Sequence, residues 1–406
     1  MRKSRVFQNY HRHTHYTNPK VSDSIARNED YAKRAAELGH GIISSCEHGY
    51  QGRYIECHEL AEKHGLKFLF GAEAYWVNDR KEADRTNCHI FLGARNEKGR
   101  QAINDALSEA NISGFHYQAR LDRELILSLP PQDVIVTSAC IAFWKYNDVD
   151  SFVEQLHDHF RGNFFLEVQY HNTESQRTLN QRILQLHNAL KIPIIMGCDS
   201  HYIHPEDGIE RDDFLVSKGM VYDDEEGWYL DYPNGDEAYR RFAEQCVLSH
   251  QEIIDAMDNT NVFLDVEKYD NPCFNTEIKM PTLHPDWSQK QRDAEYRRLV
   301  MQGFDAYRPQ IPDDQVQHYL DETNREMDIV TETKMSDYFI DNYHIIKRGK
   351  ELGGKLTKSG RGSAVSFVTN MFLGFTEVDR IAAKVKMYPE RFMSATRILQ
   401  SKSLPD

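Results

Sequence analysis

Short apolar runs alternate with stretches of helical periodicity through the first two hundred residues of the chain. The runs are bounded by polar turns and indicate buried strands, whereas the stretches between them repeat apolar residues every three or four positions. The expected strands cover residues 6–10, 41–45, 67–77, 89–94, 134–137, 164–170 and 192–197. The expected helices cover residues 28–38, 55–64, 99–110 and 174–190. This alternation predicts an α/β domain built on a parallel sheet or a closed barrel.

The second part of the chain has a different pattern. The alternation stops near residue 212, and helical patterns continue to about residue 263. Prolines scattered through 270–287 predict a connection between domains. We therefore expect a first domain over residues 1–275 and a second over residues 276–406. The second domain contains helical patterns at 289–307, 314–333 and 338–352.

Metal-binding side chains gather where the expected strands end. His11 and His13 follow the first strand, and because alternate residues of a strand face the same side, both point into one pocket. Asp199 and His201 follow the last strand in the same way. Further candidate ligands at or near strand ends are Asp23, His48, Glu73, His89 and Cys140. Nine imidazole, carboxylate and thiolate donors are too many for one tetrahedral ion, so we expect a cluster of two or three ions of zinc or manganese type.

Composition narrows the class of protein. The chain has 406 residues, of which 40% are hydrophobic and 28% charged, the balance of a soluble protein with two domains. It contains no apolar run of the roughly 18 residues that span a membrane and no signal-peptide pattern at its N-terminus, so we expect a cytoplasmic protein without membrane contact. The net charge of −14 argues against a surface that grips nucleic acid everywhere, but it leaves room for action on DNA through metal ions and a local basic strip.

The ligand hypothesis competes with a simpler explanation. A single His or Glu at a strand end is more often a cap or a hydrogen-bonded polar residue than a ligand. Two such pairs at the ends of strands in one repeating pattern are harder to explain by chance. His89 fits least well, because it precedes its apolar run. The seven cysteines lie singly, so we expect reduced thiols, with a metal ligand more plausible than a disulfide partner.

Six segments resemble the successive motifs of the PHP (polymerase and histidinol phosphatase) domain that begins bacterial DNA polymerase III alpha subunits. They are HRHTHYTN, SSCEHG, GAEAYW, CHIFLGARNEKG, TSAC and CDSHYIHPED. The resemblance implies a distorted seven-stranded (β/α) barrel with a three-metal site that has 3′–5′ exonuclease or phosphoesterase activity. The ligands it implies are His11, His13, Asp23, His48, Glu73, His89, Cys140, Asp199 and His201.

Two positions depart from the family's pattern. Glu47 stands where the family usually has Asp before the ligand His, and the stretch between His13 and Asp23 is longer than usual. The longer stretch leaves Asp30 open as an alternative to Asp23.

The segment KLTKSGRGSA places glycines, a hydroxyl group and basic side chains before an apolar, helix-like run. Backbone N–H groups of such a turn suit phosphate oxygens, although the pattern alone is also that of a flexible turn. The series GRGSA, TEVD, YPERF and SLPD resembles the palm of the same polymerase family, which implies a mostly helical, incomplete α+β palm. It implies that Gly362, Ser363 and Arg391 contact the incoming triphosphate and that Asp406 is the first of two catalytic carboxylates.

The two resemblances together predict the N-terminal portion of a replicative DNA polymerase III alpha subunit. Its expected cofactors are two or three ions of zinc, manganese or iron at the PHP site and Mg²⁺ for polymerisation in a completed palm. Its expected partners are primer–template DNA and deoxynucleoside triphosphates. A sliding clamp would bind only through regions C-terminal to this sequence. Because the sequence stops at Asp406, inside the D-x-D motif, we also expect a second polymerase segment that completes the palm.

Two alternatives stay open. A free-standing PHP phosphatase would act on a small phosphomonoester, but it has no use for the GRGSA, ERF and LPD series. A non-catalytic PHP scaffold would support polymerase assembly, but it has no need for a complete set of nine donors.

Overall fold

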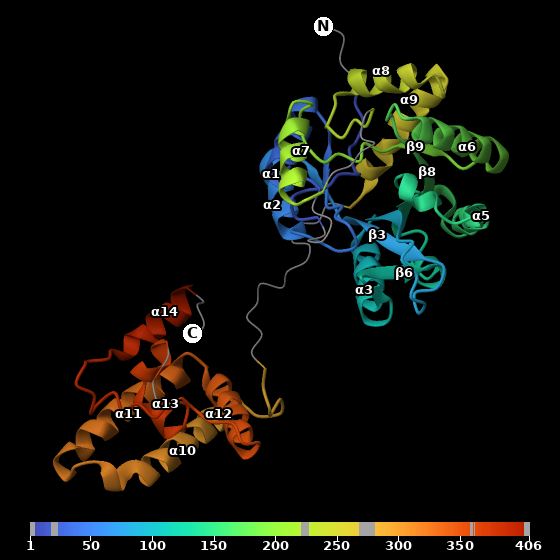
Figure 1. Cartoon of the computed structure of the whole chain (residues 1–406). Helices are drawn as coiled ribbons and strands as arrows, with labels where there is room; N and C mark the ends of the chain where they lie inside the picture. The colour runs from blue at the N-terminus through green and yellow to red at the C-terminus, as the bar shows by residue number, and fades with distance from the viewer. Residues whose placement is uncertain are drawn as a thin grey trace. The chain divides into compact units, whose positions relative to one another are not determined.

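The protein is described by a computed structural model that covers residues 5–17, 23–220, 227–267, 281–357, 360 and 362–401. Asp406 lies outside the described residues. The chain forms two compact units, residues 1–274 and residues 275–406 (Figure 1).

The first unit is built around a seven-stranded mixed sheet with the order β5-β6-β3-β4-β7-β8-β9. Its strands are β3 (Gly71–Val77), β4 (Cys88–Ala94), β5 (Phe115–His116), β6 (Gln118–Asp122), β7 (Val134–Thr137), β8 (Phe164–Val168) and β9 (Ile194–Met196). A separate parallel pair joins β1 (Ile42–Ser44) to β2 (Lys67–Leu69). The unit is thus α/β, as the alternation of apolar runs and helical stretches predicts.

The expectation of an all-parallel sheet is wrong at β4, which runs antiparallel to both β3 and β7. Residues 78–87 connect β3 to β4 without a helix. Parallel neighbours need a crossover of a dozen or more residues, usually through a helix, so this short connection returns the chain in the opposite direction.

The expected closed barrel is not formed by the described residues either, because residues 6–10 belong to no ladder. Side chains take the place of backbone pairing there: Gln8 accepts the N–H of Gly41, and Arg12 donates to the carbonyl oxygen of Ser44. Isolated bridges from Arg12 to Ser200 and from His48 to Glu73 bring these segments to the sheet. The sheet is therefore open in the described residues, but the ends of its strands still lie around one centre.

Helices flank the sheet, with α1, α2 and α7 on one side and α5 and α6 on the other (Figure 1). The helices of this unit are α1 (Asn28–Leu38), α2 (Tyr54–His64), α3 (Glu97–Ser113), α4 (Arg123–Leu127), α5 (Val149–Phe160), α6 (Glu174–Leu190), α7 (Asp207–Ser217), α8 (Gly235–Gln245) and α9 (His250–Asn259). Side-chain caps begin several of them; Asn96 accepts from the backbone of α3 and Thr173 from that of α6. Trp76, Phe143 and Phe152 pack in the core between the sheet and α5.

The second unit consists of helices in the residues that the structure describes. They are α10 (Gln289–Tyr307), α11 (Val316–Glu332), α12 (Ser336–Glu351), α13 (Val368–Phe372) and α14 (Ala395–Ser401). The expected α+β character is therefore not seen within 281–357 and 362–401. Gly303 lets α10 approach α13, because a Cβ at this position would meet the carbonyl oxygen of Phe372 at 2.0 Å. Across both units, no helix in the described part of the chain is long and apolar enough to cross a membrane.

Candidate metal centre

Glu73 on β3 lies at the centre of the converging strand ends. Its Oε2 atom is 2.7 Å from Nδ1 of His48 and 3.3 Å from Nε2 of His13. Its Oε1 atom is 3.1 Å from Nδ1 of His89 and 3.2 Å from Nε2 of His11. One buried carboxylate thus faces four imidazole rings, the position expected of a ligand that bridges metal ions.

Asp199 and the segment after it close the same centre from the end of β9. Oδ1 of Asp199 lies 3.2 Å from Nε2 of His13 and 3.4 Å from Nε2 of His11. Asp199 adopts a left-handed backbone conformation with φ 48°, uncommon outside glycine and tolerated best by Asp and Asn. Oδ2 of Asp23 lies 3.3 Å from Nε2 of His201. The structure therefore brings Asp23 to the centre.

Asp30, the alternative to Asp23, has another role. Its Oδ2 accepts the backbone N–H of Arg27 at 3.3 Å, at the start of α1. A carboxylate in the first turn of a helix stabilises the free N–H groups there. Asp30 is therefore a helix-capping residue in this structure.

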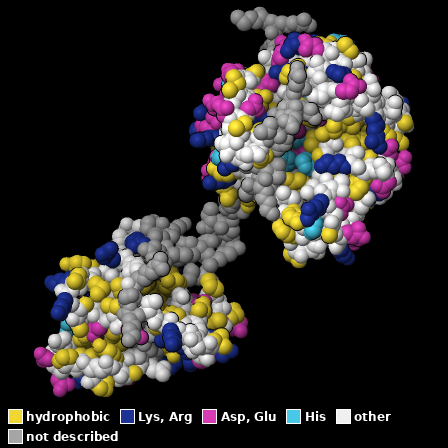
Figure 2. Space-filling view, viewed as in Figure 1, with side chains coloured by type: hydrophobic (Ala, Val, Ile, Leu, Met, Phe, Trp, Pro, Cys, Tyr) yellow, Lys and Arg dark blue, Asp and Glu magenta, His cyan; other side chains and the backbone are white. Residues whose placement is uncertain are grey.

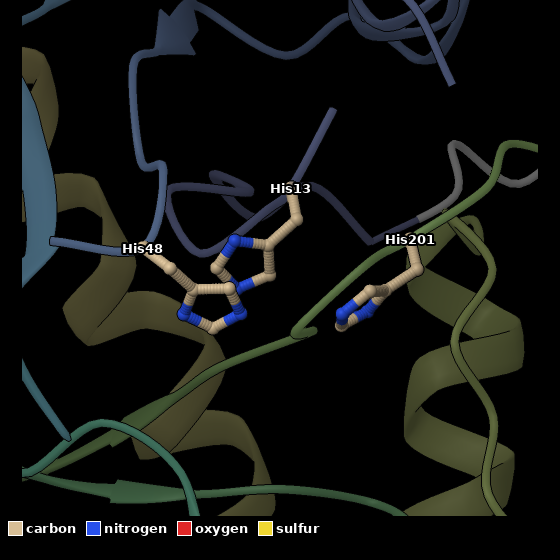
Figure 3. Close-up of side chains that lie close together, drawn as sticks. All are labelled: His13, His48 and His201. Carbon is tan, nitrogen blue, oxygen red and sulfur yellow. The ribbon is translucent and has the colours of Figure 1, made fainter. Parts of the chain in front are cut away.

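The remaining expected residues also reach the centre. Cys140, which follows β7, is buried with its Sγ atom 3.4 Å from Nδ1 of His89. The rings of His13 and His48 stack with centroids 4.0 Å apart, and the ring of His201 lies 4.8 Å from that of His13 (Figure 3). All nine side chains expected at strand ends thus lie in one cluster.

The charges in the cluster shift the pKa values of its members in opposite directions. Burial alone would lower the pKa of His13, but the nearby carboxylates of Asp199 and Glu73 outweigh it and raise the pKa to about 10. Burial, reinforced by the neighbouring His13, lowers the pKa of His48 to about 4. Burial also acts to raise the pKa of Glu73, yet the surrounding imidazoles, His89 first, hold it well below its usual value. Buried carboxylates at this density need cations beside them.

Several buried atoms of the cluster have no hydrogen-bond partner among the described residues. They are Nε2 of His11, both ring nitrogens of His13, Nδ1 of His48, Oδ1 of Asp23 and Oε2 of Glu73. Buried polar atoms are nearly always hydrogen-bonded. Nitrogen and oxygen atoms that lack such a partner and face a common space are therefore suited to bind divalent metal ions. Their ligand atoms form three overlapping groups, each within 4.8 Å. The groups are His13, His48 and His201; His11, His13 and Glu73; and His48, Glu73 and His89.

Glu167 is a residue of this site that the sequence analysis missed. The Nδ1–H group of His11 donates to Oε1 of Glu167 at 2.7 Å, and the hydroxyls of Tyr10 and Thr137 donate to Oε2 at 2.6 and 2.9 Å. Such a carboxylate orients a ligand imidazole from behind. The expected ligands lie at or near the ends of strands, whereas Glu167 lies inside β8. Its signal was a single charged residue in the apolar run FFLEV.

Glu47, where the sequence departs from the family pattern, is buried beside the cluster. It accepts the hydroxyl of Thr14 at 2.5 Å and the backbone N–H of Thr14 at 3.2 Å. Burial raises the pKa of Glu47. The Glu47 side chain, which is longer than that of the usual Asp, thus connects the segment that carries His13 to the segment that carries His48 by hydrogen bonds.

In the second unit, two of the expected nucleotide-binding segments lie side by side. Gly362 has a left-handed φ of 77° and precedes the 3-10 helix η6 (Ser363–Ser366). This helix packs against the 3-10 helix η7 (Pro389–Arg391), which carries Arg391. The rings of Phe367 and Phe392, one residue beyond each helix, are 5.0 Å apart. The structure therefore places the Ser363 and Arg391 segments together.

Comparisons with known families agree with this division of the chain. Residues 9–171 match the PHP domain, and residues 294–406 match the bacterial DNA polymerase III alpha NTPase domain. The chain joins a PHP domain to a DNA polymerase III alpha NTPase domain. The metal cluster lies in the PHP part, although Asp199 and His201 follow the matched range.

Curated relatives match nearly the whole chain. DNA polymerase III subunit alpha of Helicobacter pylori (strain ATCC 700392 / 26695) is 24% identical over an alignment of 442 positions, which covers 100% of this chain and 35% of the relative. The subunit of Borreliella burgdorferi is 25% identical over an alignment of 420 positions, which covers 98% of this chain and 34% of the relative. The chain thus spans about a third of the length of these curated relatives.

Among solved structures, a two-domain protein from Bacteroides vulgatus that contains a predicted PHP-like metal-dependent phosphoesterase is similar to the chain. It is 16% identical, has a TM-score of 0.30, and the match covers 59% of this chain and 70% of that chain. A likeness this distant adds nothing to the family assignment.

A buried ion-pair network supports the start of α13 in the NTPase domain. Glu326 on α11 accepts the backbone N–H groups of Val368 and Thr369 at 3.0 and 2.8 Å, which begin α13. Arg380 donates to the same carboxylate through Nε at 2.9 Å and also pairs with Glu322 at 2.6 Å. The network holds in place the short helix that follows η6.

Proposed function

We propose that the PHP domain binds two or three ions of zinc, manganese or iron and hydrolyses phosphodiester bonds at the 3′ end of DNA. The observation that carries the proposal is the position of Glu73, whose buried carboxylate lies within 3.3 Å of four imidazoles. Bound ions would activate water and neutralise charge on the phosphoester.

Different side chains of the cluster would bind different ions, and some would be shared between ions. Each of the three overlapping donor groups shares members with the others, since Glu73, His13 and His48 each belong to two. Shared ligands hold ions close together, as hydrolysis of a phosphodiester requires. Cys140, Asp199 and Asp23 lie within reach of these groups and would complete the coordination. The proposed ligands are therefore the nine side chains at the strand ends.

For the NTPase domain we propose a part in DNA polymerisation. Gly362, Ser363 and Arg391 would bind the incoming deoxynucleoside triphosphate, and Asp406 would be the first Mg²⁺-binding carboxylate. The support is the contact between η6 and η7 together with the similarity to DNA polymerase III alpha subunits along the chain. Primer–template DNA is the proposed partner.

The exonuclease proposal is tested with a 5′-labelled primer that carries a mismatched 3′ end. We expect metal-dependent shortening of the primer by the parent chain, and loss of this activity in His13→Ala and Asp199→Ala with unchanged circular dichroism. His15→Ala is the matched control, because His15 bonds to the backbone of Ala26 and belongs to none of the donor groups. It should cleave like the parent.

Other results would redirect the proposal. Equal cleavage by His13→Ala, Asp199→Ala and the parent would assign the nuclease to a contaminant. Hydrolysis of p-nitrophenyl phosphate without any cleavage of DNA would make the domain a phosphatase. A folded chain that retains no metal and takes up none on titration would make it a scaffold.

A further inference from the structure

The β5–β6 hairpin emerges beside the metal centre, because β6 and the His48 segment share one edge of β3. His48 bridges to Glu73, and Arg120 of β6 pairs with Tyr75, two residues further along β3. Neighbouring strands lie about 5 Å apart, so the beginning of β6 comes next to the segment that carries His48. Tyr117, the turn residue of the hairpin, immediately precedes β6.

The hairpin presents aromatic rings to solvent. Phe115 is 60% exposed and Tyr117 is 52% exposed, and Ile112 at the end of α3 is 80% exposed. The guanidinium of Arg85 lies 4.2 Å from the centre of the Tyr117 ring. Hydrophobic and Lys or Arg side chains gather over β6, on the face that also shows a group of histidines (Figure 2). Flat rings combined with a guanidinium can stack on nucleobases.

Tyr117 has a backbone conformation that is costly for an aromatic residue, and its ring and hydroxyl contact Arg85. Its φ of 64° lies in the left-handed region, which glycine and asparagine adopt at much lower cost. Because half of the ring is exposed, core packing does not account for an aromatic residue at this turn. Strain of this kind is found where a side chain serves a site.

Two exposed cations lie at the β3–β4 loop, residues 78–87, whose three basic residues are balanced by Asp79, Glu82 and Asp84. Nζ of Lys145 donates to the carbonyl oxygens of Thr86 and Asn87 at 3.2 Å each, and Arg85 precedes these residues. The loop leads directly into β4 and His89. Lys145 and Arg85 are exposed cations available to a phosphate backbone, whereas the exposed Asp79 and Glu82 would oppose it.

We propose that the β5–β6 hairpin binds unpaired nucleotides of single-stranded DNA whose 3′ end enters the metal centre. Phe115 and Tyr117 stack on the bases, while Arg85 and Lys145 contact the phosphates. Stacking tolerates every base, so binding is independent of sequence. The inference rests on the proposed function and deepens it, because it names the surface element that would bind the unpaired end of the DNA strand.

The test uses the full chain without metal ions, so that binding is measured separately from cleavage. The probe is a twelve-nucleotide oligothymidylate with a photoreactive 4-thiothymidine near its 3′ end. We expect crosslinks to the peptide that contains Phe115 and Tyr117, whatever the NTPase domain binds elsewhere. Phe115→Ala and Tyr117→Gly should reduce this crosslink and weaken the PHP-dependent binding at least tenfold, whereas Phe115→Trp retains it.

Two further variants separate stacking from other roles. Tyr117→Gly relieves the backbone strain, so its melting temperature should equal or exceed that of the parent while DNA binding falls; a structural role predicts that both fall. Ile112→Ala removes an equally exposed apolar side chain that cannot stack, and it should bind DNA like the parent. Glu82→Gln should tighten binding by removing the opposing charge.

The outcomes distinguish this inference from the proposed function. Crosslinks that avoid the hairpin, or parent-like binding by Phe115→Ala and Tyr117→Gly, overturn it. An equal loss of DNA binding in Ile112→Ala also overturns it, because a side chain that cannot stack would then matter as much as the rings. The surface would then be an apolar protein-docking patch. Hairpin-dependent binding without any cleavage once metal is added would contradict the nuclease proposal and leave the hairpin as a DNA-binding element.

Discussion

The Nδ1 atom of His11 lies 2.7 Å from Oε1 of Glu167, and this contact decides which nitrogen of His11 faces the metal centre. The carboxylate accepts the hydrogen bond, so Nδ1 carries the hydrogen. In the neutral form that binds metal, the lone pair of His11 is on Nε2, which faces Glu73 and Asp199. Gln169 donates to the same Oε1 atom at 2.8 Å. A buried network in the middle of the sheet thus prepares one ligand of the cluster.

Replacement of this carboxylate should weaken metal binding without removing a ligand. We expect Glu167→Gln to lower metal affinity by about 10- to 100-fold, the usual effect of losing such a partner. Competition with a chromophoric chelator measures the affinity. Glu174→Gln, an exposed change in the first turn of α6, is the control. Equal affinities for the two variants would show that Glu167 does not orient His11.

Gly197 makes room for Glu167. A Cβ at position 197 would meet Oε1 of Glu167 at 1.9 Å, too close for the buried carboxylate to stay in place. Gly197→Ala should therefore lower the free energy of unfolding by about 1–3 kcal/mol, the range for overpacking, and weaken metal binding as well. Gly162→Ala, where nothing lies within 4 Å of the new atom, should change stability by about 0.5 kcal/mol or less. Urea unfolding of both variants measures the difference.

Metal uptake should release protons. Although burial opposes it, the carboxylates raise the pKa values of His11 and His13, that of His13 to about 10, so both imidazoles are protonated in the metal-free protein at pH 7. Burial also raises the pKa of the Cys140 thiol. Ligation requires neutral imidazole and thiolate, so affinity should rise with pH. Calorimetric titration in two buffers of different ionisation enthalpy should give different heats; identical heats would contradict the prediction.

The sequence leaves Asp23 and Asp30 as alternative metal ligands, and a matched pair of variants tests which of them binds metal. Asp23→Asn should reduce the number of bound ions per chain and slow hydrolysis, because Asp23 lies 3.3 Å from His201 in the cluster. Asp30→Asn should keep the metal content of the parent, because Asp30 contacts the N-terminus of α1. Elemental analysis after gel filtration measures both. Loss of metal from Asp30→Asn alone would reverse the assignment.

In the NTPase domain, Glu326 should matter more than its neighbour Glu322. Glu326→Ala leaves Arg380 buried without its main partner and removes the acceptor for two N–H groups of α13, so a loss of about 3–5 kcal/mol is expected. Glu322→Ala removes a partly exposed ion pair and should cost about 1 kcal/mol or less. Thermal unfolding of the full chain compares them. Similar losses would mean that the buried network does not support α13.

Local patterns were sufficient for much of the secondary structure. The helices expected at 28–38, 174–190 and 289–307 have the bounds of α1, α6 and α10, because their apolar stripes lie within the segments and their N-cap residues directly precede them. Helix α5 and the β5–β6 hairpin were missed. The hairpin strands are two and five residues long, too short for a periodic signal.

Strand direction and closure depended on partners far away in the sequence. The direction of β4 follows from a short connection. Residues 6–10 belong to no ladder, and the side chains of Gln8 and Arg12 contact the backbone at Gly41 and Ser44 instead. Apolar periodicity reports which residues are buried, but it does not report which strand will be the neighbour.

The sequence by itself identified the candidate metal-binding side chains, with Asp23 and Asp30 as alternatives for one position, because a strand end exposes alternate residues to one pocket and the chain repeats that arrangement several times. Only the tertiary structure decided that Asp23 and not Asp30 joins them, that Glu167 stands behind His11, and that an aromatic hairpin borders the centre. Each of these depends on a contact between segments distant in sequence, such as the 156 positions between His11 and Glu167. Contacts of that kind arise from packing, and no local pattern encodes them.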